Sequence, residues 1–133
     1  MTITADGPLT IVPGVTRSGG RIVPPAAPPA VLVWDDGTRT PVHERTAFGR
    51  NPSVAGVRAV AVRDETLSVS RTHFEIGADA DGMVWVRDLG STNGVRVRRG
   101  AHVRDLAPLQ HQELRSGDIL EVGDRWAKIE GVR

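Results

Sequence analysis

The strongest constraint on the fold is a succession of short apolar segments separated by turn residues. Most segments alternate apolar and polar residues or are rich in β-branched ones, which is typical of strands. No apolar period near 3.6 persists over about a dozen positions, so helices are not expected. The expected strands are residues 31–34, 40–43, 45–48, 57–62, 73–76, 83–89, 95–98, 119–122 and 126–129. The sequence therefore predicts an all-β protein, a sandwich of mostly antiparallel strands.

The first 29 residues differ in composition from the rest of the chain. They hold six of the nine prolines and four glycines, and none of the five aromatic residues. A segment without large side chains cannot offset the entropy of its own ordering. We expect residues 1–29 to be a flexible leader or linker and residues 30–133 to form one domain.

Composition excludes several functional classes. The chain has no cysteine, which rules out disulfides and thiolate metal sites, and its formal net charge is +1. A charge so close to zero argues against broad binding to nucleic acid or anionic membranes. The longest apolar stretch, residues 22–34, contains four prolines and is shorter than the ~20 residues of a spanning helix. No secretory signal is readable, and we expect a cytoplasmic chain, alone or as the cytoplasmic domain of a larger protein.

Three turn-like segments carry donors that suit an anion: residues 48–50, 70–73 and 90–94. Loops at one end of a sandwich converge in space even when they are distant in sequence. A phosphothreonine carries roughly −1.5 to −2 charges and three strong acceptor oxygens. Its receptor needs arginine together with neutral donors, and the three segments contain both. The sequence therefore predicts a phosphate site.

These three segments, in this order and at these separations, resemble the forkhead-associated (FHA) domain family. Residues 114–123, Leu-Arg-Ser-Gly-Asp-Ile-Leu-Glu-Val-Gly, are similar to the last strands of that family. The resemblance covers roughly residues 30–133. It implies a β-sandwich of about eleven strands, with recognition loops at one end. It also implies a phosphopeptide-binding module that recognises phosphothreonine-containing proteins downstream of a Ser/Thr kinase.

The resemblance also implies a role for each matching binding residue. Arg50 would bind the phosphate, Ser70 would donate its hydroxyl to it, and Arg71 would add a second cationic contact. Thr92 would donate to the phosphate or line the pocket for the threonine methyl group. Asn93 would hold the peptide main chain next to the phosphorylated residue.

Three further residues would support the site without touching the ligand. Gly49 and Gly94 would be architectural, and His73 would brace the loops. The residues between Arg50 and Ser70 compare only loosely with the family. The peptide side-chain preference is therefore not carried over.

An enzyme is one alternative. Ser70 and His73 could form a nucleophile and a base, but the sequence has no Gly-x-Ser-x-Gly, no Walker A loop and no His-Glu-x-x-His. The four histidines show no metal-ligand spacing. We expect no catalytic residue, no metal and no cofactor.

A nucleic-acid binder is another alternative, because four arginines follow one another closely along one predicted edge. No aromatic residue lies among them, so a solvated strand face is the simpler interpretation. A further option is that this edge contacts acidic residues of a bound peptide. The residues are Arg96, Arg98, Arg99 and Arg104.

Two other hypotheses keep the fold and change its use. The domain could be a scaffold that binds a partner without phosphate. Alternatively, a kinase could phosphorylate a threonine of the leader, which would then bind its own domain at high effective concentration. The leader threonines are Thr2, Thr4, Thr10 and Thr16.

Overall fold

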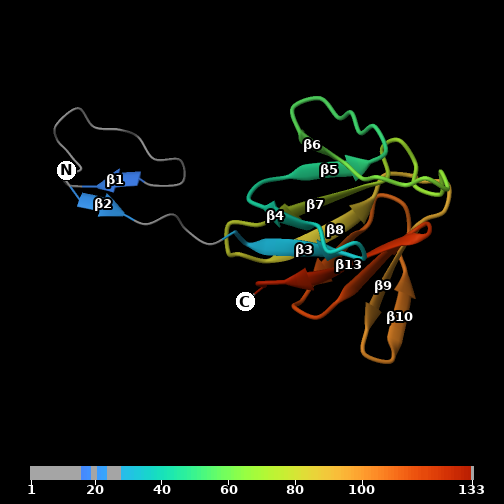
Figure 1. Ribbon diagram of the computed structural model, residues 1–133. Helices are drawn as coiled ribbons and strands as arrows, with labels where there is room; N and C mark the ends of the chain where they lie inside the picture. Colours follow the sequence, from blue (N-terminus) through green and yellow to red (C-terminus); the bar gives the residue numbers. More distant parts are fainter. Residues whose placement is uncertain (1–15, 19–20, 24–27, 133) are drawn as a thin grey trace.

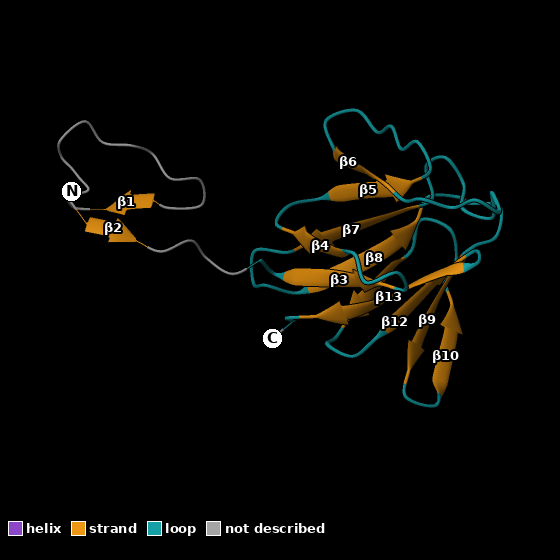
Figure 2. Cartoon of the chain, in the orientation of Figure 1, coloured by secondary structure: helices purple, strands orange, loops and turns teal. Residues whose placement is uncertain are grey.

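The computed structural model describes residues 16–18, 21–23 and 28–132. Residues 28–132 form two packed sheets of short strands with no helix among them, as Figures 1 and 2 show. Their strands are β3 (Ala30–Trp34), β4 (Arg39–Val42), β5 (Thr46–Gly49), β6 (Arg58–Ala61), β7 (Phe74–Ala78), β8 (Val84–Asp88), β9 (Val95–Arg99), β10 (His102–Asp105), β11 (His111–Leu114), β12 (Ile119–Val122) and β13 (Arg125–Glu130).

The eleven strands divide into a six-stranded and a five-stranded sheet. The larger sheet has the order β10-β9-β12-β13-β3-β4, and the smaller has the order β11-β8-β7-β5-β6. The pair β5 and β6 is parallel, and the other pairs in these two sheets are antiparallel. The predicted sandwich of about eleven mostly antiparallel strands is confirmed.

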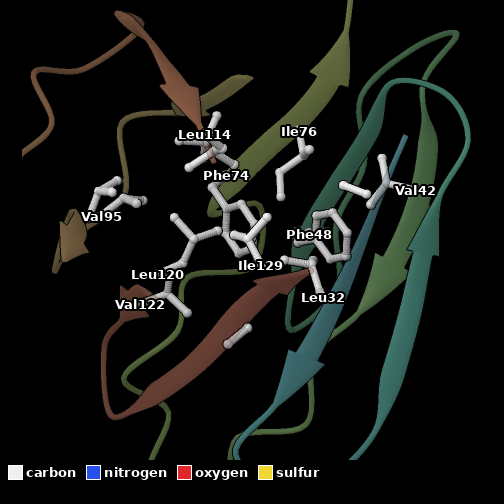
Figure 3. Close-up of a cluster of buried hydrophobic side chains, with 14 of the residues drawn as sticks. Leu32, Val42, Phe48, Phe74, Ile76, Val95, Leu114, Leu120, Val122 and Ile129 are labelled. Carbon is white, nitrogen blue, oxygen red and sulfur yellow. The ribbon is translucent and has the colours of Figure 1, made fainter. Parts of the chain in front are cut away.

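The core lies between the sheets, where both contribute alternate side chains. Phe48 of β5 and Phe74 of β7 stack with ring centroids 4.8 Å apart, and Trp34 of β3 lies 6.3 Å from Phe74. All three are buried. Figure 3 shows aliphatic side chains, among them Leu120 and Ile129 of the larger sheet, gathered around these rings.

Some strands were not expected from the sequence. The edge strands β10 and β11 are largely exposed and polar, so no apolar pattern marked them. In the leader, β1 (Thr16–Ser18) pairs antiparallel with β2 (Arg21–Val23). Residues 1–15, 19–20 and 24–27 of the predicted flexible leader lie outside the described residues.

One end of the sandwich collects most of the long connections. The strand directions bring the start of the β5–β6 connection and the loops after β6, β8, β10 and β12 to this end, which lies to the right in Figure 1. We call it the recognition end. All three sequence segments singled out as phosphate-binding are located there. Among the described residues, no helix is long and apolar enough to cross a bilayer.

Candidate functional site

Gly49, the last residue of β5, lets two loops of the recognition end come together. A Cβ at this position would lie 2.8 Å from the Ser70 carbonyl oxygen and closer still to that of Arg71. The backbone N–H of Arg50 donates to the Ser70 carbonyl at 3.0 Å, and that of Asn51 donates to the Arg71 carbonyl at 3.0 Å. The absence of a side chain at Gly49 therefore permits the contact between the Arg50 and Ser70 loops.

The Arg50 side chain is half-buried and aligned by the neighbouring loop. Its Nε donates to the Val69 carbonyl oxygen at 2.5 Å. Among the described residues, neither Arg50 nor the exposed Arg71 forms a salt bridge. Two guanidinium groups without an internal counter-ion are available here to an outside anion.

Ser70 joins the second loop to the third. The backbone N–H of Thr92 donates to the Ser70 Oγ at 3.0 Å. The hydroxyl hydrogen of Ser70 has no acceptor within the described part of the chain. The side-chain amide of Asn93 donates to the Ser68 carbonyl at 2.7 Å, which leaves its Oδ1 as an acceptor. Ser70, Thr92 and Asn93 are thus brought together, and the last two are exposed.

His73 is fully buried behind these loops and bonds to both of them. Its Nδ1 accepts the Ser70 N–H at 3.0 Å, so Nε2 carries the proton and donates to the Gly94 carbonyl at 2.7 Å. Gly94 has φ of 75°, a conformation that favours glycine. The buried His73 ring and the Gly94 carbonyl that it contacts therefore join the second and third loops.

Sequence reasoning missed Asp64 and Ser68, which shape the loop before Ser70. The Asp64 carboxylate accepts the Val69 N–H at 2.7 Å, the Ser68 hydroxyl at 2.9 Å and the Thr66 hydroxyl at 2.8 Å. Partial burial raises the pKa of Asp64, but these hydrogen bonds outweigh it and lower the pKa to about 2. An Asp followed closely by Thr and Ser is a signal for such side-chain to backbone bonding.

A comparison with protein-family models gives one assignment. The FHA domain model matches residues 46–123, more than half of the chain, and spans all three loops. The chain belongs to the FHA domain family. A comparison with curated protein sequences gives no match.

Solved structures of FHA domains share this fold. An FHA domain from a structural and functional analysis of phosphothreonine-dependent FHA domain interactions is 29% identical. It covers 78% of this chain and 97% of its own, with a TM-score of 0.57. The FhaA FHA domain complexed with the intracellular domain of Rv3910 is 30% identical, with coverages of 76% and 99% and a TM-score of 0.56. The FHA domain of the CT664 protein from Chlamydia trachomatis, at 23% identity, has a TM-score of 0.61 and coverages of 78% and 98%.

In this FHA domain the loops are bonded to one another, so the site does not depend on a ligand for its shape. Among the described residues, no group of three or more His, Asp or Glu side chains is placed to hold a metal ion. What the site offers is two unpaired guanidinium groups and neutral donors. That set suits an oxyanion.

Proposed function

We propose that this FHA domain binds phosphothreonine-containing proteins produced by Ser/Thr kinases. The observation that carries the proposal is the convergence of Arg50, Ser70, Arg71 and Thr92 at one end of the sandwich. Within the described part of the chain, no carboxylate is paired with either arginine. A phosphate group would supply the missing negative charge and the acceptors.

Each residue has a distinct contact in this proposal. Arg50, already aligned by Val69, binds the phosphate, and Arg71 adds a second cation. The Ser70 hydroxyl donates its uncommitted hydrogen to a phosphate oxygen. Thr92 contacts the phosphate or the threonine methyl group. Asn93 uses its Oδ1 to accept a main-chain N–H of the peptide, since its amide nitrogen is held by Ser68.

The proposal extends to the organisation of the chain. Residues 30–133 form the binding domain and residues 1–29 a leader, in a cytoplasmic protein. Members of the FHA family are recognition modules without catalytic activity, and the site described here needs neither cofactor nor metal. The complex is reversible, because a few loops hold one extended peptide segment.

Fluorescence anisotropy with matched peptides tests the function. A degenerate peptide pool with one fixed position carries threonine, phosphoserine or phosphothreonine there, and the protein is titrated against each. We expect binding of the phosphothreonine pool, binding of phosphoserine weaker by about fourfold for one unburied methyl, and no binding of threonine. Equal binding of all three pools would refute phosphate recognition and favour a phosphate-independent scaffold.

A further inference from the structure

Two leucines at the recognition end have both an unusual backbone and an exposed side chain. Among the described residues, Leu67 and Leu109 are the non-glycine residues with positive φ, at 59° and 64°. Their side chains are 66% and 63% exposed, more than any other large apolar residue described. A left-handed backbone is unfavourable for a residue with a branched side chain, and glycine or asparagine would suit both positions better.

Both leucines adjoin the loop that carries Thr92 and Asn93. Leu67 precedes Ser68, whose carbonyl accepts the Asn93 amide at 2.7 Å. The backbone N–H of Leu109 donates to the Asp88 carbonyl at 2.8 Å. The Asp88 side chain in turn accepts the backbone N–H of Ser91 at 3.0 Å. Both leucines therefore lie close to this loop or to its base.

A groove of about 640 Å³ lies beside this loop, and the sequence neighbour of each leucine lines it: Ser68 next to Leu67, and Pro108 next to Leu109. Thr92 and Asn93 form part of its wall, so the groove continues directly from the phosphate-binding loops.

The charged residues of the groove are paired internally. Arg96 lies 2.9 Å from Asp105 and 3.7 Å from Glu121. Asp124 Oδ2 lies 2.8 Å from the Thr66 hydroxyl oxygen. Because these charges have partners, a charged peptide side chain would compete with existing bonds. The exposed leucines, which are sequence neighbours of groove-lining residues, offer apolar surface that a peptide could cover without such competition.

Polar contacts of the neighbouring residues determine the conformation of the loop around Leu67. The exposed leucine side chain does not contribute to it. Asp64 accepts the backbone N–H of Val69 at 2.7 Å and the Ser68 hydroxyl at 2.9 Å, while Asp124 donates its backbone N–H to Ser68 Oγ at 2.7 Å. Leu67 and Leu109 are exposed and adopt an unfavourable backbone conformation. Such residues are candidates for a role in binding, because they contribute little to the stability of the fold.

We propose that Leu67 and Leu109 are specificity-determining residues for the bound peptide. They contact apolar side chains of the peptide segment that extends from the phosphothreonine along this groove. The occupant is thus a phosphothreonine peptide with large apolar residues next to its phosphorylated position. This inference rests on the proposed function.

The test uses the full chain and its variants Leu67→Asn and Leu109→Asn, since asparagine tolerates the left-handed backbone. Met83→Asn is the matched control, because Met83 is an exposed apolar residue, 42% accessible, in the β7–β8 turn at the opposite end. A phosphothreonine peptide library with varied flanks is selected on each protein, and anisotropy then compares the best apolar-flanked peptide with its alanine-flanked counterpart.

Wild type and Met83→Asn should select large apolar flanks and bind the apolar-flanked peptide roughly tenfold more tightly than the alanine-flanked one. Each leucine variant should lose most of this preference. Both should bind the alanine-flanked peptide as wild type does and melt no lower than wild type.

Several results would overturn the inference. Phosphothreonine binding without any apolar preference, or with a preference that both variants keep, would remove it and leave the proposed function intact. A melting temperature lowered by Leu67→Asn would assign the leucine to the fold. Self-association of the peptide-free protein that the variants abolish would assign the leucines to a dimer contact. Absence of phosphothreonine-dependent binding in wild type would instead refute the proposed function itself, together with this inference.

Discussion

The arginines of the recognition loops and those of strand β9 differ in whether a carboxylate neutralises their charge. Arg50 and Arg71 form no salt bridge with any described residue. The β9 arginines are each paired with a carboxylate of the larger sheet or its turns. Those pairs are Arg96 with Asp105 at 2.9 Å, Arg98 with Glu121 at 3.0 Å and Arg99 with Asp118 at 2.8 Å.

The difference shows that a run of basic residues in a sequence need not form a basic surface. The charges at positions 96, 98 and 99 are neutralised within the sheet, which weakens the case for a nucleic-acid contact at this edge. Arg104, the fourth arginine there, donates to the side-chain oxygen of Gln112 at 2.7 Å. An unpaired arginine is therefore a better indicator of an anion site than a cluster of paired ones.

The sharpest test of this comparison replaces one arginine from each group. Arg50→Ala should weaken binding of a phosphothreonine peptide roughly 100-fold, because a charge-assisted contact is lost, and should change the melting temperature little. Arg98→Ala, which removes a paired and exposed arginine, should bind as wild type does. Anisotropy titrations and thermal melts measure both effects. Equal binding by the two variants would show that pairing does not distinguish them.

Arg99→Ala should act on stability and leave phosphate recognition unchanged. Asp118 is 1% exposed, and Arg99 approaches it through both Nε and Nη2 at 2.8 Å. Removing the cation leaves a buried carboxylate with less compensation, at a cost of about 3 kcal/mol of unfolding free energy. Urea denaturation measures the loss, and peptide affinity of the folded protein is the control. An unchanged denaturation midpoint would mean that water replaces the guanidinium.

Asp64→Asn should produce a smaller, pH-dependent change. The folded-state pKa of Asp64, about 2, lies below its ordinary value of 3.8, so its charged form stabilises the native state above pH 3.8. This stabilisation is lost as the pH falls through about 2. The variant should therefore lose roughly 1 kcal/mol at pH 7, and its deficit should shrink between pH 4 and pH 2. Denaturation curves across this range test it, and a constant deficit would contradict the assignment.

Arg96→Ala should have the smallest effect. Its partner Asp105 is largely exposed and the arginine is half-exposed, so the pair is screened by solvent and salt. We expect little change in unfolding free energy and no change in peptide binding. A larger loss at low salt, measured by urea denaturation, would show that the β9 pairs act as a network.

Much of the sandwich could be predicted because its inner strands are short runs of apolar or alternating residues bounded by turn residues. The segment 73–76 alternates polar and apolar residues as a strand should, although β7 buries its polar Glu75 as well. The Asp-Asp-Gly turn at 35–37 marks the β3–β4 hairpin. β10 could not be found in this way, because all four of its residues are exposed. A strand without a buried face has no apolar period.

The sequence was sufficient to predict which residues form the candidate site, but not which hydrogen bonds hold them. Arg50 and Ser70 could be chosen from residue type, order and the FHA resemblance. The bond from Arg50 Nε to the Val69 carbonyl depends on how two loops 19 residues apart meet. The strained backbones of Leu67 and Leu109 left no sign in the sequence either, since leucine is not a residue that predicts a left-handed conformation.

The adjacency of β3 and β13 in the larger sheet determines how this domain can be attached to other segments. The two strands are antiparallel neighbours, with Val31 opposite Glu130, so the start of one and the end of the other lie side by side. Both points are at the end of the sandwich away from the recognition loops (Figure 1). A tether joined at either point, or at both, would leave the binding end facing outward. The domain therefore has the geometry of a cassette that can be inserted into a longer chain without covering its own ligand.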